Sequence, residues 1–270
     1  MPELPEVETS RREVMKSCRG RTIVSVFAKD DRIVFDGIVP RTFAAKMKGR
    51  RIVGSGRHGK QYWLVLDKPP FPIFHYGMTG WMDVYRDALD RPRFCKMELL
   101  LDDGTRIGYR DPRRLGRIRL RKDPEHEPPV SELGFDPLND MESLDYFRDA
   151  FAIRKAPVKA VLLDQKFCAG IGNWIADEIC YQTKVDPRKR ANEMALPEIR
   201  RVRKKLTDII AHAVKVGADD SKFPRIWLFH YRWGKKAAVD GKGRSIEFIT
   251  VGGRTTAWVP EIISKQISGK

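Results

Sequence analysis

The chain has 270 residues, of which 41% are hydrophobic and 33% are charged, a composition typical of a globular protein with room for two domains. No stretch approaches the ~18 uninterrupted apolar residues of a membrane helix, and the N-terminus is too acidic for a signal peptide, so we expect a soluble, intracellular protein. Lys and Arg outnumber Asp and Glu by 52 to 36, which gives a net charge of +16 and an isoelectric point near 9.8. This surplus indicates a polyanionic partner, most simply a nucleic acid; the alternative is a merely basic protein.

The first expected element is a helix over the opening segment, MPELPEVETSRREVMKSCRG. Its apolar residues are three, four or seven apart, the spacing of one helix face. They are Leu4, Val7, Val14, Met15 and Cys18. Prolines and acids precede this stripe, where the first turn of a helix favours them, and Gly20 stands where the helix should end.

Residues 21–122 are expected to be mostly β-structure. The segments are short, aromatic and β-branched, and Gly, Pro and Asp interrupt them. They read RTIVSVFA, RIVGSG, KQYWLVLD, FPIFHYGMTGWMDVY and KMELLLDDGTRIGYR, the last with a hairpin turn at DDGT, 102–105. Several strands at this spacing predict a sandwich or barrel, partly covered by the opening helix. We therefore place an N-terminal β-sandwich domain at 1–135.

Residues 123–142 are rich in proline and acid, so we expect a linker at 136–142. The second domain, 143–270, turns helical, with helices expected in PVKAVLLDQ, in NWIADEICYQ and over about 196–217. The apolar stripe of the last helix contains Leu196, Ile199, Val202, Leu206, Ile209, Ile210 and Ala213. A final strand pair, SIEFITVG and RTTAWV, closes a hairpin at about 234–260. The fold class is therefore α+β.

The four cysteines, Cys18, Cys95, Cys168 and Cys180, contain no CxxC pair. In an intracellular protein this spacing supports neither a disulfide framework nor a four-cysteine zinc site. We expect each to be a small buried apolar residue.

Pro2 could carry chemistry if Met1 is removed, because it would then present a free secondary amine. An α-amino group has a pKa of about 8, so part of it is neutral and nucleophilic at pH 7. A helix dipole at this position lowers that pKa, whereas the adjacent Glu3 carboxylate raises it. Glu3 is also placed to act as a general acid or base. Without further context, a plain helix start is the simpler interpretation.

PELPEVETSRR, however, resembles the opening of the formamidopyrimidine-DNA glycosylase and endonuclease VIII family. The resemblance continues through RHGKQYWLVLD, HYGMTG, RDPRRLG, QKFCAGIGNWIADEICYQ and TVGGRTTAWVP, so it covers nearly the whole chain. It looks closest to the plant- and fungal-type formamidopyrimidine-DNA glycosylases. It implies a leading β-sandwich, a helix–two-turns–helix element and a finger hairpin.

The resemblance also implies catalytic roles in the first half of the chain. Pro2 matches the nucleophile, Glu3 its acid/base partner, and Glu6 a residue that orders the active site. Lys60 matches a lysine that assists elimination and holds backbone phosphate. The alternative for Pro2 and Glu3 is a plain helix start, and the alternative for Lys60 is a solvated lysine on a strand.

Three further residues match groups that fill the gap left by a flipped base. Met78 matches an intercalating methionine, Arg113 an arginine that contacts the orphaned base, and Leu115 an apolar wedge. Leu115 departs from the phenylalanine common in the family, and leucine stacks less well. In the second half, Asn173 and Arg254 match phosphate-binding residues. Without the resemblance, a plain capped helix hairpin explains Asn173 equally well.

Most relatives hold the finger hairpin with four zinc-binding cysteines, whereas this chain has no cysteine after Cys180. We therefore expect a zinc-less finger, packed through Phe248, Trp258 and Val239, and neither a metal nor a diffusible cofactor. The loop at 217–232 corresponds to the lesion-selecting loop; its Phe223, Trp227 and Phe229 could stack on a flipped base or belong to the core.

The resemblance implies a bifunctional glycosylase and AP lyase. It would act on double-stranded DNA with a damaged base or abasic site, through a Pro2 Schiff base and β,δ-elimination. Zinc-less relatives tend to prefer formamidopyrimidines and hydantoins over 8-oxoguanine. Two alternatives stay open: a non-catalytic DNA- or RNA-binding module, and an endonuclease VIII-like enzyme for abasic sites and oxidised pyrimidines. We expect a monomer and, from the zinc-less finger of eukaryotic relatives, a nuclear location.

Overall fold

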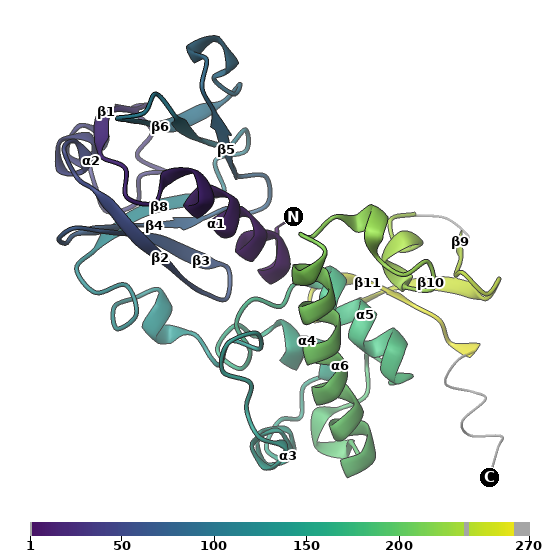
Figure 1. Ribbon diagram of the computed structural model, residues 1–270. Coiled ribbons are helices and arrows are strands. Elements are labelled where there is room, and N and C mark those ends of the chain that lie inside the picture. The colour runs from purple at the N-terminus through teal and green to yellow at the C-terminus, as the bar shows by residue number, and fades with distance from the viewer. Residues whose placement is uncertain (1, 235–237, 262–270) are drawn as a thin grey trace. The chain divides into compact units, whose positions relative to one another are not determined.

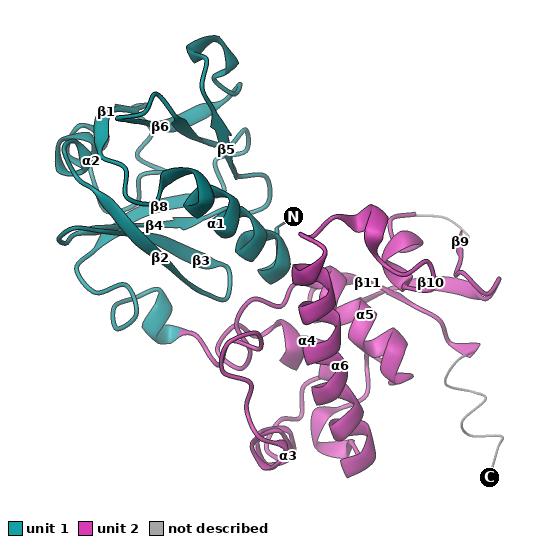
Figure 2. Cartoon of the chain, viewed as in Figure 1, with its two compact units in different colours: residues 1–132 teal, residues 133–270 magenta. Residues whose placement is uncertain are grey.

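The computed structural model describes residues 2–234 and 238–261, and the chain divides into two compact units (Figure 2). Unit 1 spans residues 1–132 and unit 2 spans residues 133–270. The segment expected as a linker, 136–142, lies in unit 2. There the buried Asp136 carboxylate accepts hydrogen bonds from the backbone N–H groups of Leu138 and Asn139, at 3.0 and 3.2 Å.

Helix α1 (Leu4–Cys18) opens unit 1 (Figure 1). It buries the apolar face that the sequence predicts. Four of the five predicted residues are at most 1% exposed, and Met15 packs at the edge of the same core. The chain leaves the helix through Gly20, whose φ of +82° is a left-handed conformation that glycine adopts readily. The predicted opening helix is confirmed.

Two four-stranded antiparallel sheets form most of unit 1, with strand orders β1-β6-β7-β5 and β2-β3-β4-β8. Side chains of both sheets share one hydrophobic core, and α1 packs against β2, β3 and β5. The strands are β1 (Ile23–Ala28), β2 (Ile52–His58), β3 (Gln61–Leu66), β4 (Phe71–His75), β5 (Trp81–Tyr85), β6 (Cys95–Leu101), β7 (Arg106–Arg110) and β8 (Arg117–Arg121). The α+β class and the β-sandwich with a leading helix are confirmed.

Two elements of unit 1 escaped the sequence analysis. Helix α2 (Pro40–Met47) lies inside the stretch expected to be β. Pro40 at its first position and the buried pair Phe43 and Met47, four residues apart, are its signals, but they cover only two turns. Strand β8 reads RIRLR. Its alternating arginines make the segment polar overall, so the single buried residue, Ile118, gives only a weak strand signal. The predicted hairpin turn at 102–105 does join β6 to β7.

Within its described residues, 133–234 and 238–261, unit 2 contains four α-helices longer than one turn and a three-stranded sheet in the order β11-β10-β9. The elements are α3 (Leu144–Ala152), α4 (Val158–Leu163), α5 (Asn173–Thr183), α6 (Leu196–Lys215), β9 (Ala238–Val239), β10 (Ser245–Val251) and β11 (Arg254–Trp258). Short 3₁₀ turns occupy Ala88–Asp90 and Val130–Glu132 in unit 1, and Ala191–Glu193, Asp220–Lys222 and Leu228–His230 in unit 2. The predicted helices and hairpin strands are confirmed within a few residues.

Two packing expectations in unit 2 are wrong. Leu196, placed on the buried stripe of α6, is 42% exposed because it stands at the first helical position, beyond the core. Val239, expected to hold the hairpin, is 55% exposed on the edge strand β9. The other two expected residues do pack: Phe248 lies against a cluster of Leu228, Ile246, Ala257 and Val259, and Trp258 is buried beneath the Arg188 guanidinium.

All four cysteines are free and buried, as expected. Desolvation by burial raises the pKa of Cys18 and of Cys180 to about 12 and that of Cys95 to about 11. Over 2–234 and 238–261, no helix has the length and apolar character needed to cross a membrane.

Candidate functional site

The first turn of α1 brings Pro2, Glu3 and Glu6 together. Pro2 is half-buried, and it directly precedes Glu3, the N-cap residue, whose side chain is 1% exposed. The Glu3 backbone N–H donates to Glu6 Oε2 at 2.9 Å, which fixes the chain direction where the helix begins. A nitrogen at position 2 therefore sits at the positive end of the α1 dipole beside a buried carboxylate.

A buried ion pair ties α1 to the turn that carries Lys60. Arg57 of β2 donates through Nε to Glu8 Oε2 at 2.9 Å and through Nη1 to the Gly59 carbonyl, also at 2.9 Å. Gly59 and Lys60 form the two-residue turn between β2 and β3. Although burial raises the pKa of Glu8, Arg11, Arg12 and Arg57 together lower it to about 2. The Glu8–Arg57 pair therefore positions the Lys60 turn relative to α1, and sequence reasoning missed it.

Met78 lies in the tight turn between β4 and β5, and its side chain is 39% exposed. Gly77 has φ +60° and donates its N–H to His75 Nδ1 at 3.2 Å. Burial, reinforced by the positive charge of Lys60 and two β8 arginines, lowers the pKa of His75 to about 4. The imidazole is therefore neutral at pH 7 and accepts this hydrogen bond through Nδ1.

One buried carboxylate fastens the Met78 turn to the loop of Arg113 and Leu115. Asp111 is 0% exposed, and its Oδ1 accepts from Thr79 Oγ1 at 3.0 Å and from the Arg113 N–H at 3.2 Å. Its Oδ2 accepts from the Gly116 N–H at 2.7 Å. The Asp-Pro pair at 111–112 was a signal for such a side-chain-capped turn, although the sequence analysis did not use it.

The two loops also touch directly. A Cβ built on Gly77 would lie 2.5 Å from the backbone C and O of Leu115, so only glycine permits this approach. Leu115 is 40% exposed, and Arg113 also faces solvent. The neighbouring Arg114 is engaged instead with Asp31, at 3.0 Å. Met78, Arg113 and Leu115 thus stand on one backbone frame with their side chains outward, an arrangement suited to entering a duplex.

In unit 2, Asn173 and the start of β11 lie together. Asn173 is the first residue of α5, after the glycine-containing turn 170–172, and its Nδ2 donates to the Thr255 carbonyl at 2.8 Å. Arg254 begins β11 and is exposed, directly after the glycines 252 and 253, both with positive φ. Gln165 holds the 170–172 turn by donating to the Ile171 carbonyl and accepting from the Gly170 N–H. This group presents an amide, helix N–H groups and a guanidinium, which are phosphate-binding groups.

The aromatic residues of loop 217–232 belong to the core of unit 2. Phe223, Trp227 and Phe229 are 2, 6 and 8% exposed. Phe223 contacts the rings of both others and of Trp174, with centroid distances of 5.0–5.7 Å. Of the two interpretations drawn from sequence, stacking on a flipped base and core packing, the structure favours core packing.

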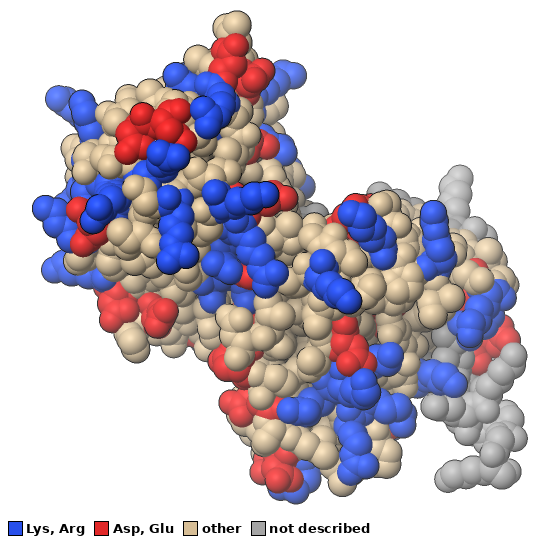
Figure 3. Space-filling model, in the orientation of Figure 1, with Lys and Arg blue, Asp and Glu red and all other residues tan. Residues whose placement is uncertain are grey.

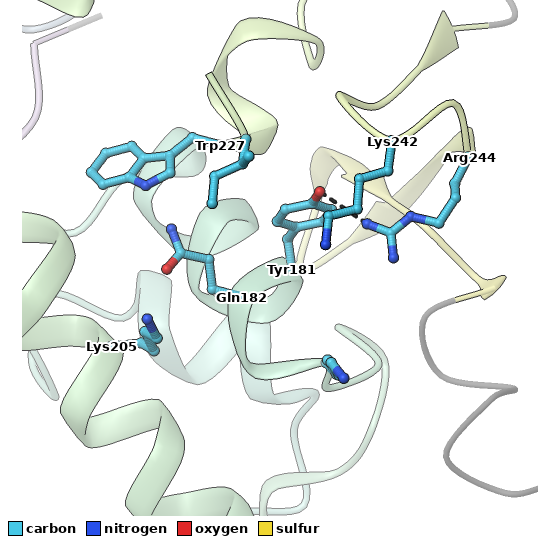
Figure 4. Close-up of a pocket in the computed structure, with 8 residues that line it drawn as sticks. Tyr181, Gln182, Lys205, Trp227, Lys242 and Arg244 are labelled. Atoms are coloured by element: carbon cyan, nitrogen blue, oxygen red, sulfur yellow. Dashed lines mark hydrogen bonds between the residues drawn. The ribbon is translucent and has the colours of Figure 1, made fainter. Parts of the chain in front are cut away.

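Lys and Arg side chains are spread over both units on the face drawn in Figure 3, with smaller groups of Asp and Glu among them. Unit 2 also has a basic pocket with a volume of about 240 Å³ (Figure 4). It is lined by Tyr181, Gln182, Lys184, Lys205, Ile226, Trp227, Lys242 and Arg244. Arg244 is held by Asp240 at 2.6 Å and donates to the Tyr181 hydroxyl. Positive charge is therefore not confined to the residues predicted from sequence.

Family models match three successive parts of the chain. The formamidopyrimidine-DNA glycosylase N-terminal domain matches residues 1–118, and the formamidopyrimidine-DNA glycosylase H2TH domain matches residues 133–225. The formamidopyrimidine-DNA glycosylase-like C-terminal domain matches residues 227–260.

Full-length relatives and solved structures point to the same family as these models. A formamidopyrimidine-DNA glycosylase of Arabidopsis thaliana is 41% identical over 97% of this chain and 70% of its own length. That of Bacillus subtilis is 31% identical over 98% of this chain and all of its own. The Lactococcus lactis enzyme bound to DNA with an AP site matches with a TM-score of 0.85 and 25% identity, over 96% of this chain and 98% of that one. Its complex with Fapy-dG DNA also gives 0.85, with 25% identity over 96% and 99%.

The family models, the full-length relatives and the solved complexes with damaged DNA together define a DNA glycosylase that acts on oxidised bases. The chain belongs to the formamidopyrimidine-DNA glycosylase family, in which AP lyase activity is typical. Its partner is DNA containing a damaged base or an abasic site. The family and the α+β fold expected from sequence are both confirmed.

Proposed function

We propose that this chain removes oxidised bases through a covalent intermediate on Pro2. The observation that carries the proposal is the start of α1, where Pro2 directly precedes the buried Glu3 and Glu6 fixes the Glu3 amide at 2.9 Å. Removal of Met1 would expose the Pro2 secondary amine at the positive end of the helix, beside a group able to move protons.

In this mechanism the Pro2 nitrogen forms a bond to C1′ of the damaged nucleotide, and the bond from C1′ to the base breaks. The base leaves with that electron pair and takes up a proton. The proton of the Pro2 nitrogen passes to the ring oxygen O4′ as the C1′–O4′ bond breaks, which opens the sugar and gives an iminium. The iminium acidifies the C2′ proton, and loss of that proton expels the 3′ phosphate. Loss of the C4′ proton then expels the 5′ phosphate and leaves a one-nucleotide gap, and water hydrolyses the iminium to free Pro2 from the sugar remnant. Glu3 and Lys60 move protons or hold phosphate.

The DNA contacts divide between the two units. Met78, Leu115 and Arg113 of unit 1 enter the space left by the flipped base, with the Arg113 guanidinium on the orphaned base. Asn173 and Arg254 of unit 2 bind backbone phosphate. Solvent exposure supports these roles, because a side chain must be accessible to contact DNA. Met78 and Leu115 are 39 and 40% exposed, and Arg254 is exposed.

Borohydride trapping on a duplex with one abasic site tests the covalent step. We expect an adduct from the native protein and none from a form extended at its N-terminus. Pro2→Gly, whose primary amine can still condense with the sugar aldehyde, should give a weaker adduct. A form extended at its C-terminus serves as the matched control and should react normally. Tight DNA binding without any adduct would favour the non-catalytic module, and an adduct undiminished by blocking Pro2 would assign the chemistry to a lysine, with Lys60 the first to test.

Lesion choice is proposed to favour formamidopyrimidines and hydantoins over 8-oxoguanine. The support is the cysteine-free hairpin, which matches the zinc-less relatives, together with a 217–232 loop whose aromatic residues are committed to the core. Excision rates on matched duplexes decide it. 8-Oxoguanine opposite cytosine as the best substrate would contradict the proposal, and a preference for oxidised pyrimidines would favour the endonuclease VIII-like alternative.

We also keep a monomeric state and a nuclear location as proposals. The support for the second is the eukaryotic character of zinc-less relatives. Light scattering of the purified chain and imaging of a fluorescent fusion in plant or fungal cells check the two.

A further inference from the structure

The finger hairpin of unit 2 does not fit the zinc site by which most of the family holds this element. The chain has no cysteine after Cys180, and the four cysteines it does have are buried elsewhere. In the part of the chain that the structure describes, no group of three or more His, Cys, Asp or Glu side chains could hold a metal ion. The hairpin strand β11 must therefore be held to the helices by other contacts.

Those contacts centre on Asp177 of α5, whose side chain is 0% exposed. Its Oδ1 lies 2.6 Å from Lys159 Nζ of α4, a residue that is also 0% exposed. Its Oδ2 accepts from Arg232 Nη2 at 2.7 Å and from the backbone N–H of Ala257 in β11 at 3.2 Å. One carboxylate thus joins two helices, the segment before the hairpin and the hairpin strand itself.

Lys159 completes the connection to β11. Besides its ion pair with Asp177, its ammonium group donates to Thr256 Oγ1 at 2.6 Å and to the Thr255 carbonyl at 3.2 Å. The Thr255 carbonyl also accepts from Asn173 Nδ2 at 2.8 Å. The cluster of Lys159, Asp177 and Arg232 therefore contacts three consecutive residues of β11, 255–257, and reaches Asn173 through one shared carbonyl.

This arrangement fixes geometry more than it adds stability. Removing charged groups from water costs free energy that offsets their mutual attraction, so a buried ion cluster is weak evidence for stability; in some proteins such a cluster specifies one arrangement of the chain. Here the specified structure is the position of β11 on α5. Arg254 is the residue immediately before the three that the cluster holds, and Asn173 is four residues before Asp177, on the same face of the helix.

We propose that Asp177, with Lys159 and Arg232, is a positioning residue that takes the place of zinc: it sets β11 on α5 so that Arg254 and Asn173 face the same DNA backbone. The proposal rests on the phosphate-binding roles given to those two residues above. Asp177 touches no substrate in this account and acts only through them.

The test compares Asp177→Asn with Asp240→Asn, a matched control at the other end of the hairpin, where the buried Asp240 holds Arg244. Cleavage of abasic duplex DNA gives KM and kcat, and amide exchange gives the protection of β11. For Asp177→Asn we expect KM to rise at least tenfold with kcat within twofold of the native value at saturating DNA. We also expect faster exchange at residues 255–257, and a slope of log affinity against log salt that is smaller by about one. Asp240→Asn should leave all of these unchanged.

Thr256→Val provides a second variant if Asp177→Asn does not fold, because it removes only one acceptor of Lys159. It should raise KM about threefold and speed exchange at 255–257. An unchanged KM and unchanged exchange in the variants that fold would overturn the proposal, as would a fall in kcat with KM unaltered. Arg254→Gln measured alongside separates the two proposals: normal affinity in that variant would refute its phosphate role, whereas β11 exchange would still report on Asp177.

Discussion

Burial of Glu178 predicts a loss of stability with rising pH that one amide substitution should remove. Its side chain on α5 is 0% exposed, and burial raises its pKa to about 7. Hydrogen bonds from Gln182 Nε2 at 2.7 Å and from the Phe229 N–H at 2.9 Å, together with the Arg232 charge, lower the pKa but do not offset burial. The carboxyl is therefore protonated in the folded protein at pH 5 and ionises inside the core near pH 7.

The sign and size of the effect follow from proton linkage. The ordinary pKa of the group is 4.5, so between pH 4.5 and pH 7 the folded state binds more protons than the unfolded chain, and the free energy of unfolding falls as pH rises. The difference from 4.5 to about 7 corresponds to ~3 kcal/mol at 1.36 kcal/mol per pKa unit, of which ~2.5 kcal/mol lies between pH 5 and pH 8.

Urea unfolding of the native protein and of Glu178→Gln, at pH 5 and at pH 8, measures this term. Tryptophan fluorescence suits the purpose because four of the six tryptophans, Trp174, Trp227, Trp233 and Trp258, lie in unit 2. The free energy of unfolding of the variant, relative to that of the native protein, should be ~2.5 kcal/mol higher at pH 8 than at pH 5. The pKa of His75 in unit 1 is lowered to about 4, so this residue makes the free energy of unfolding rise with pH. Both proteins contain His75, so its contribution cancels when they are compared at the same pH.

Glu247→Gln, an exposed change in the same unit, is the control and should follow the native pH dependence. Parallel pH dependence of the native protein and Glu178→Gln would refute the reasoning, because it would mean that the buried carboxyl keeps an ordinary pKa.

Two further predictions concern unit 1. Glu8→Gln leaves the buried Arg57 of β2 without its carboxylate and releases the turn of Lys60. We therefore expect kcat/KM on abasic DNA to fall about tenfold (~1.4 kcal/mol). Glu13→Gln, on the exposed face of α1, is the control and should leave kcat/KM unchanged. Steady-state kinetics measure both, and equal activities would contradict the positioning role. Gly77→Ala would press a methyl group onto the Leu115 backbone and should lower kcat/KM on lesion duplexes at least tenfold. Gly104→Ala has a positive φ but open space around it, so it should cost only ~1 kcal/mol of stability and no activity; a similar loss in both variants would point to backbone strain alone.

The sequence was sufficient for the elements whose signals are local. The α1 stripe, the hairpin strands and the 102–105 turn each depend on spacing within a few residues, and all are confirmed. Helix α2 was missed because it is two turns long within β-rich sequence, and Val239 was misplaced because edge-strand exposure depends on which strand has a neighbour.

The site residues that could be named from sequence lie in short motifs. The buried charged residues that position them lie in no motif. Asp177 reads as an ordinary helix acid, and its cations lie 18 residues before it and 55 after it in the chain. Glu8 and Arg57 likewise meet across 49 residues. Only folding brings such pairs together, so no periodicity or spacing in the sequence records them.

The bonds of Asp111 have a consequence for how this protein can change. Two of its three partners are backbone N–H groups, at positions 113 and 116, which every residue except proline supplies. The frame beneath the exposed side chains is thus indifferent to what those side chains are. Leu115 takes no part in the bonds of Asp111, so the residue type at 115 does not alter them. The side chains that we propose to enter the duplex can therefore change one at a time without removing a bond of this frame.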